Sequence, residues 1–134
     1  MTIWIFAFFV FAHGVAHMVY TSLAMGWIPA ADVNSTWSGA SWLLTGALGL
    51  PATRSLGASV FTLVTLAFAV AAVSITLRQP WASTWLAGTA IASILALFLF
   101  WDGSLQDLVS KGAIGLAINK AILIALYVFR FPAA

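Results

Sequence analysis

Long runs of hydrophobic residues, interrupted by short polar stretches, make up most of the chain. A helix of about 20 apolar residues crosses a bilayer core of about 30 Å, and the sequence has four runs that approach this length. Polar or turn-forming residues follow the first three runs, at 26–39, 78–80 and 102–107. The pattern predicts membrane-spanning helices at 3–25, 55–77, 81–101 and 112–131.

The segment SWLLTGALGLP, residues 41–51, is also apolar but is much shorter. It has about 10 residues before Pro51, too few to cross a bilayer. We therefore expect a short interfacial or re-entrant helix between the first two spans, with Trp37 and Trp42 at the depth of the lipid headgroups. A second interpretation joins the segment to the next span through a kink at Pro51, and the sequence leaves both open.

The composition agrees with a lipid environment. The chain has 134 residues, of which 63% are hydrophobic and 6% charged, and its mean hydropathy is +1.10. A soluble domain has roughly 25% charged residues, because its surface needs polar cover. The sequence therefore predicts an all-α fold: a four-helix transmembrane bundle that forms one integral membrane domain over residues 1–134.

The few charged residues indicate an orientation in the membrane. A pI of about 9.5 reflects the scarcity of acids and does not indicate a nucleic-acid surface. An excess of Lys and Arg marks the cytoplasmic side of a membrane protein. Four spans place the amino terminus, Arg78 and Arg130 on one side, and Arg54 and Lys111 on the other. We therefore expect both termini to be cytoplasmic.

Polar residues inside the first and last spans are the candidate functional site. In FAHGVAHMVY, residues 11–20, His13, His17 and Tyr20 are spaced four and three apart and share one helical face. The fourth span carries Asn119 and Lys120. At 1.5 Å per residue, His17 and Lys120 both lie about 12–13 Å from the same membrane edge. We expect the two spans to touch, with Lys120 turned inward toward His17.

Three interpretations of this polar set remain open. An ionisable residue within a span indicates a functional site. The five residues therefore predict a pocket for an amphipathic ligand, a quinone or a lipid, or a role of the protein as an accessory subunit. No catalytic residue is assigned. The first alternative is a quinone-linked oxidoreductase subunit. The second is a purely structural subunit, in which the polar groups join helices by hydrogen bonds. We also expect a homo-oligomer or a larger membrane complex.

The sequence gives little support to a metal or haem site. It has no cysteine, which excludes thiolate ligands, disulfides and covalent haem attachment. Histidines at i and i+4 can bind one metal ion, but no carboxylate lies within a span to complete the ligand set. Haem usually takes a histidine from each of two helices, and spans two to four have none.

Small residues predict the faces on which the helices pack, since helices in lipid associate through close contact. In the second span they recur every three or four residues. Larger residues lie off this seam, where they would face lipid or fill gaps: Phe61, Leu63, Leu66 and Phe68. The predicted seam residues are Ala58, Thr62, Thr65, Ala69, Ala72 and Thr76. In the third span the stripe consists of Ser83, Ala87, Ala90 and Ser93.

Four sequence elements together resemble small bacterial four-helix membrane proteins, loosely of the DoxX-like kind. They are HGVAHM, SWLL, the tryptophans that open the third span, and FWDGSLQDL before the fourth. The most specific part is HGxAH, residues 13–17. DoxX-like proteins include quinone-linked oxidoreductase subunits and membrane chaperone-like proteins. The resemblance therefore implies a link to quinone or an accessory role in a bacterial cytoplasmic membrane.

Overall fold

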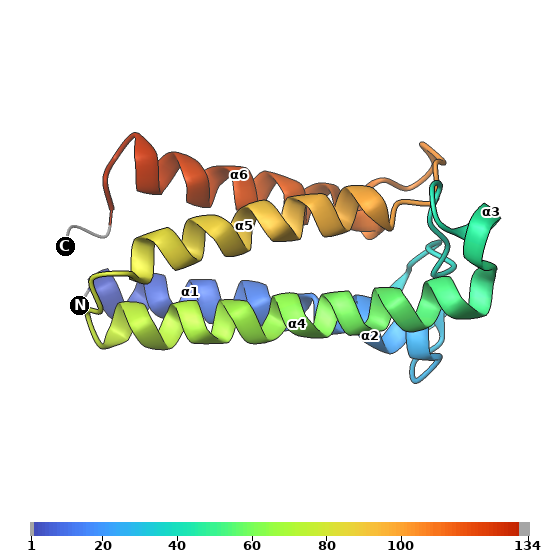
Figure 1. The fold of residues 1–134 in the computed structure, drawn as a ribbon, viewed down its shortest axis with the longest axis horizontal. Coiled ribbons are helices and arrows are strands. Elements are labelled where there is room, and N and C mark those ends of the chain that lie inside the picture. The colour runs from blue at the N-terminus through green and yellow to red at the C-terminus, as the bar shows by residue number, and fades with distance from the viewer. Residues whose placement is uncertain (1, 132–134) are drawn as a thin grey trace.

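Four long helices lie side by side in the computed structural model, which describes residues 2–131 (Figure 1). Every regular element in that range is a helix. Four helices are long and apolar enough to cross a membrane, namely Thr2–Met25, Leu50–Thr76, Ala82–Leu99 and Val109–Tyr127. The predicted all-helical bundle with four spans is therefore confirmed, with boundaries that differ by five residues or fewer.

Two of the four spans consist of two consecutive elements each. The first consists of α1 and α2, the second and third are α4 and α5, and the fourth begins with a π-helical turn, η2, before α6. A 3-10 turn, η1, and a single-turn helix, α3, lie in the long connection between the first two spans. The bounds are α1 Thr2–Ala16, α2 Met18–Met25, η1 Ala30–Val33, α3 Thr45–Leu48, α4 Leu50–Thr76, α5 Ala82–Leu99, η2 Val109–Ala113 and α6 Ile114–Tyr127.

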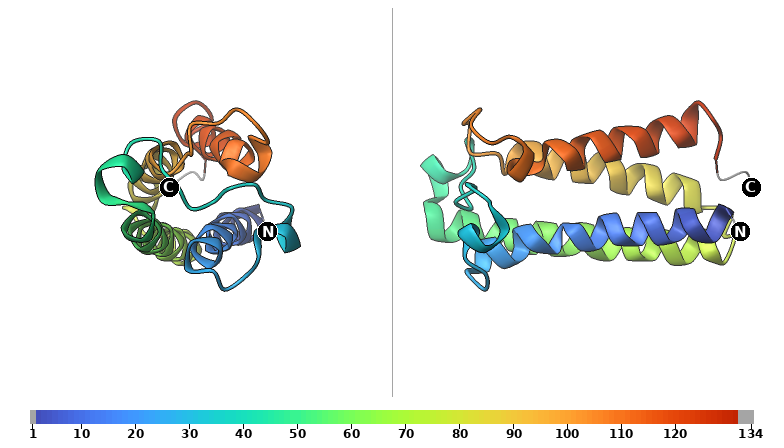
Figure 2. Two further views of the ribbon diagram at one scale, coloured as in Figure 1. Left: turned by 90° about the vertical axis from the view of Figure 1, so that its right-hand side faces the viewer. Right: turned by 180° about the vertical axis from the view of Figure 1, so that it is seen from behind.

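The helices follow one another around the bundle in chain order. α1 and α2 pack along α4, α4 packs along α5, and α5 packs along α6 (Figure 2). The first and last spans therefore face each other across the remaining side, where they are not packed along their lengths. This opening decides where a cleft can form.

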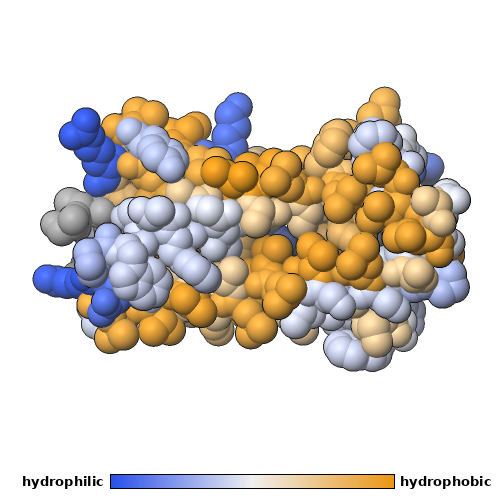
Figure 3. All heavy atoms as spheres, viewed as in Figure 1, coloured by the Kyte–Doolittle hydropathy of each residue, from blue (hydrophilic) through white to orange (hydrophobic). Residues whose placement is uncertain are grey.

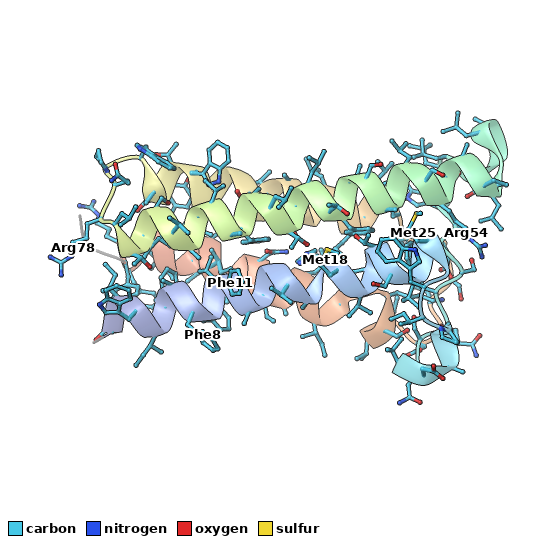
Figure 4. The ribbon with its side chains drawn as sticks, turned by 90° about the horizontal axis from the view of Figure 1, so that it is seen from below. Phe8, Phe11, Met18, Met25, Arg54 and Arg78 are labelled. Carbon is cyan, nitrogen blue, oxygen red and sulfur yellow. The ribbon has the colours of Figure 1, made fainter. Side chains whose placement is uncertain are left out.

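The two ends of the bundle differ in what they contain. The amino terminus, the α4–α5 turn and the end of α6 lie together, whereas the long connection and the α5–η2 loop lie at the opposite end (Figure 1). Arg78 and Arg54 mark these two ends in Figure 4. We call them the terminal end and the loop end.

The segment 41–51 ends at the loop end and does not cross the bundle. Its only helix is the four-residue α3, and Gly49, at a φ of 79°, separates it from α4. Pro51 lies in the first turn of α4, where proline fits because its missing N–H has no helical partner there. The kinked continuous span is therefore wrong, and α4 begins at Leu50 rather than at residue 55.

The long connection caps the carboxyl end of α5. The last carbonyls of a helix have no partner within it, and here four successive carbonyls accept hydrogen bonds from residues 37–42. The donors and acceptors are Trp42 Nε1 to Phe98 O (3.0 Å), Ser41 Oγ to Leu99 O (2.5 Å), Trp37 Nε1 to Phe100 O (2.8 Å) and Trp42 N to Trp101 O (2.7 Å). Both tryptophans lie in the connection at the loop end, where Trp42 is exposed and Trp37 is buried inside the protein at 3% exposure.

Large aromatic side chains fill the centre of the bundle beside buried small residues of α4. Phe61 and Phe68 of α4 are 1% and 0% exposed, so of the two expected places they take the gaps inside the bundle. Leu63 and Leu66 are 65% and 55% exposed and face outward. Gly14 of α1 makes the room, because a Cβ at this position would lie 2.4 Å from the Cβ of Phe68. The hydroxyl of Thr65 donates to Gly14 O at 3.0 Å across the same crossing.

The outer surface is apolar over the flank of the bundle. Figure 3 shows orange, hydrophobic spheres along α4 and α6, and several of the few strongly hydrophilic residues lie at the terminal end. Phe8 is 71% exposed and projects away from α1 (Figure 4). In water such a surface would be strongly unfavourable, so the protein is in contact with the lipid bilayer.

Candidate functional site

Four buried polar side chains from three spans form one hydrogen-bonded network. Nε2 of His13 bonds Oδ1 of Asn119 at 3.0 Å, Nδ2 of Asn119 donates to Oγ of Ser93 at 2.7 Å, and Oγ of Ser93 lies 2.7 Å from Nε2 of His17. Each residue is 6% exposed or less. The network joins α1, α5 and α6, and it links the first and last spans across the open side of the bundle.

The acceptors in this network fix the position of every shared proton. Nδ1 of His17 lies 3.0 Å from the carbonyl of His13, which can only accept, so Nδ1 carries the proton. In a neutral imidazole Nε2 is then the acceptor, and it takes the hydroxyl proton of Ser93. Oδ1 of Asn119 can only accept, so Nε2 of His13 donates to it. All four bonds are satisfied together with both imidazoles neutral.

The backbone around His17 departs from a regular helix to make this arrangement. The N–H of His17 donates to Gly14 O, three residues back, at 3.0 Å. The carbonyl of His13 would normally accept that bond, and here the imidazole of His17 takes its place. This local change separates α1 from α2 within one continuous span.

Aromatic rings enclose the two imidazoles. The ring centroids of His13 and His17 are 4.9 Å apart, and Phe68 packs against both at 5.0 Å and 5.6 Å. Tyr20 stacks on Phe61 at 4.9 Å, one turn closer to the loop end. The histidines therefore lie in an environment from which water is largely excluded.

A cleft of about 250 Å³ lies next to the network, on the open side between α1/α2 and η2/α6. Apolar side chains form most of its wall, and residues of the long connection and η2 lie at its loop end. The polar side chains that line it are His13, His17, Tyr20, Ser35 and Ser110, and the apolar ones include Val19, Leu97, Ile114 and Ile118. A mostly apolar cleft with a few polar groups is typical of small-molecule sites.

The turn η2 lies close to the cleft because of one glycine. Gly112 has a φ of 107°, and a Cβ there would lie 2.7 Å from Leu97 and 3.3 Å from the hydroxyl of Tyr20. Next to it, the buried amine of Lys111 forms an ion pair with Asp102 at 2.9 Å. These contacts bring Ser110 within 3.4 Å of the Tyr20 hydroxyl.

The structure brings four of the five predicted site residues together and places the fifth elsewhere. His13, His17 and Tyr20 share one face of the first span, and Asn119 points at His13. Lys120 is exposed on the outside of α6, so its expected contact with His17 is wrong. Successive helical residues are turned by about 100°, so Asn119 and Lys120 cannot both point inward.

Ser93 is the member of the network that sequence analysis did not assign to the site. It was placed in the small-residue stripe of the third span, and it is indeed fully buried there. A serine inside a span is equally typical of close packing and of interhelical hydrogen bonding. A histidine on the neighbouring helix would indicate the hydrogen-bonding role, but the sequence does not show which helices are neighbours.

A larger groove on the outside of the bundle has a different character. It has a volume of about 660 Å³ and is lined by α4 and α5 residues such as Trp81, Trp85 and Gly88, with no ionisable side chain. Such a groove suits acyl chains, whereas the cleft beside the histidines has polar groups that can orient a ligand.

No family model, curated protein or solved structure matches this chain. Within residues 2–131, no group of three or more His, Asp or Glu side chains is placed to hold a metal ion. The geometry of the cleft is therefore the basis for a proposed function.

Proposed function

We propose that this integral membrane protein binds the polar head of an amphipathic molecule, a quinone or a lipid, in the cleft between α2 and α6. The observation that carries the proposal is that Tyr20 and His13 both line one mostly apolar cleft. The hydroxyl of Tyr20 is a donor, and Nδ1 of His13 is an acceptor. A carbonyl and a hydroxyl are the ligand groups that match this pair.

The acceptor is on His13. This residue uses Nε2 to donate to Asn119, and a neutral imidazole then has a lone pair on Nδ1. Among the described residues, every fully buried side-chain nitrogen or oxygen has a hydrogen-bond partner. Nδ1 of His13 has no such partner, so it is not fully buried. His13 is also one of the residues that line the cleft.

The donor is on Tyr20. Its hydroxyl lies 3.4 Å from the carbonyl of Ser110, which is well beyond the about 2.7–2.8 Å of a good O–H···O bond. A ligand carbonyl would offer a shorter bond at little cost. The ring is held by stacking on Phe61 and by an edge contact with Trp37, so the hydroxyl is already positioned.

The open side of the bundle supports entry from the membrane. The cleft lies where the first and last spans are not packed together, and its wall is mainly apolar. An isoprenoid or acyl tail could remain among the lipids while the head enters between the helices. At the terminal end the Phe6 and Phe131 rings, 5.0 Å apart, bridge the same two spans.

Two measurements test the proposal. Extraction of the protein purified in mild detergent, followed by mass spectrometry, is expected to find a quinone or a lipid retained in stoichiometric amount. A titration of the protein in nanodiscs with a short-chain quinone, and separately with a short-chain diacylglycerol, is expected to quench or shift tryptophan fluorescence. The probe that saturates identifies the class of head group.

The two tyrosines of the chain provide a matched pair of variants. Tyr20→Phe removes the donor and is expected to weaken binding about tenfold, the loss of one good hydrogen bond. Tyr127→Phe makes the same change on an exposed tyrosine at the terminal end and should leave binding unchanged. Equal binding by both variants, or no saturable response to either probe, would contradict the proposal.

A further inference from the structure

We propose that the outer face of α6 around Lys120 docks a transmembrane helix of a different protein, one that carries an aspartate or glutamate at mid-membrane depth. This inference is independent of the proposed function, because Lys120 lies outside the cleft. It starts from a cation that this chain exposes to the lipid.

Lys120 lies well inside the hydrocarbon region. At 1.5 Å per residue it is about 9 Å from Ile114, where α6 begins, and about 10 Å from Tyr127, where α6 ends. A charge at such a depth is unfavourable by several kcal/mol unless it is paired or hydrated. Its side chain is exposed rather than turned into the bundle, so the bundle interior does not supply the partner.

The direction of α6 makes escape to the headgroups difficult. Cα–Cβ bonds in a helix tilt toward its amino terminus, and for α6 this is the loop end. The four-carbon stem of lysine is shorter than the distance from Lys120 to either end of α6. Snorkelling to a lipid phosphate at the terminal end also requires the side chain to turn back against its natural direction.

A second copy of this chain cannot supply the counter-charge. The sequence has three acidic residues, Asp32, Asp102 and Asp107, and all three lie in the connections at the loop end. Asp102 is already paired with Lys111. A carboxylate at the depth of Lys120 must therefore come from a different protein.

The surface around Lys120 has the shape that a helix needs for close approach. Ala117 and Ala121 lie one turn apart and flank the lysine, and small residues at this spacing allow helix backbones to come close. Together with larger apolar residues they form one exposed face at helical spacing, which we call the Lys120 face. It consists of Ala117, Lys120, Ala121, Ile124, Tyr127 and Val128.

The test uses the full chain and defined peptide probes in phosphatidylcholine vesicles. Three hydrophobic transmembrane peptides differ only at their central residue, which is Asp, Asn or Leu. The absence of native cysteine allows one dye at Ser104→Cys in the exposed loop, and energy transfer to labelled peptide reports association. We expect the Asp peptide to associate about tenfold more strongly than the Leu peptide.

Variants locate the interaction on the Lys120 face. Lys120→Met should abolish the preference for the Asp peptide, whereas Lys120→Arg should retain it. Ala117→Ile should weaken association by blocking close approach, while Ala92→Ile, on the exposed surface of α5, should not. Lys120 is exposed, so its substitution is not expected to disturb folding, and unchanged helical circular dichroism checks this.

Three outcomes would overturn the inference. The first is equal association of all three peptides with the wild-type chain and with Lys120→Met. The second is loss of the Asp preference when phosphatidylglycerol replaces part of the phosphatidylcholine, because an anionic lipid would then be the partner. The third is self-association that depends on Lys120 and excludes the Asp peptide. Quinone or lipid binding in the cleft would survive each of them.

Discussion

The imidazole of His17 illustrates how single residues set the structure of this site. Its Nδ1 takes the place of a backbone N–H at the carbonyl of His13, and its Nε2 receives a proton from Ser93. One side chain therefore replaces a backbone hydrogen bond of the first span and links that span to the third. Because Nε2 is the acceptor in this bond, adding a proton to His17 would reverse the bond and leave the hydroxyl proton of Ser93 without its acceptor.

Loss of the Ser93 hydroxyl should destabilise the bundle strongly for so small a change. In Ser93→Ala, Nε2 of His17 and one N–H of Asn119 lose their partners in a buried environment, at an expected cost of about 1–3 kcal/mol in the free energy of unfolding. The measurement is reversible unfolding in mixed detergent micelles, followed by circular dichroism. Ser59→Ala is the control, because Ser59 is exposed and bonds only its own helix. Equal stability of both variants would show that the network contributes nothing.

Asp107 at the loop end should titrate at unusually low pH. The hydroxyl of Ser110, 2.6 Å from its carboxylate, is the main cause that lowers its pKa below the ordinary 3.8, and Thr36 adds to this. A lowered pKa means that the carboxylate favours the folded loop at higher pH and loses this contribution as pH falls through the folded pKa. Carboxyl NMR shifts should give a midpoint below 3.8 that rises in Ser110→Ala. An unchanged midpoint in that variant would disprove the assigned cause.

At the scale of elements, the crossing of α1 and α4 depends on Gly14. A Cβ at this position would lie 2.4 Å from that of Phe68, so Gly14→Ala must move the helices apart or displace the phenyl ring. We expect a loss of about 1–3 kcal/mol in the free energy of unfolding, typical of overpacking. Gly88→Ala on α5 is the control, since no atom lies within 4 Å of its added methyl, and better helix propensity should make it neutral or stabilising. If both variants gain stability, the crossing is looser than described.

The hydrogen bonds that cap the carboxyl end of α5 should be weakened when the indole of Trp37 is replaced. Trp37→Phe removes the Nε1 donor that serves Phe100 O and leaves that carbonyl without its partner under a buried ring. We expect about 2 kcal/mol of destabilisation in the same unfolding assay. Trp27→Phe makes the same change at a tryptophan that is 64% exposed and should shift stability by less than about 0.5 kcal/mol. Similar values for the two variants would mean that the connection does not stabilise α5.

These elements also show what the sequence can and cannot predict. Hydropathy located the four spans, since each must satisfy its backbone within itself and expose apolar side chains to lipid. The shared face of His13, His17 and Tyr20 followed from spacing along one helix. The positions of Lys120, Phe61 and Ser93 depend on which helices are neighbours and how each is rotated. Trp37 could not be assigned because its partners lie 63 residues away in sequence.

At the scale of the whole molecule, the bundle is open on one side, and this property supports the proposed cleft. The first and last spans are joined by the bond between His13 and Asn119 and are not packed along their lengths, which leaves a cleft on the inner side. α6 packs along α5 alone among the long helices, so its outer side remains available to another helix. A closed square bundle would have filled the cleft, whereas the Lys120 face points away from the bundle axis and would stay exposed.

The orientation of the bundle in the membrane can be tested on the intact protein. The terminal end has Arg78 and Arg130, whereas at the loop end the amine of Lys111 is buried against Asp102 and Arg54 is bound to the carbonyl of Ser38. From the excess of basic residues at the terminal end we predict that this end is cytoplasmic.

Single cysteines in the cysteine-free chain provide the measurement. In intact cells, Ser104→Cys in the loop after α5 should react with a membrane-impermeant maleimide, and Gln79→Cys in the α4–α5 turn should react only after the membrane is permeabilised. The reverse pattern would invert the orientation but preserve the fold. Equal reaction at both positions in sealed cells would contradict four spans, because α5 alone separates these two segments. The accessible side also decides from which leaflet an amphipathic head group would reach the cleft, which lies toward the loop end of the bundle.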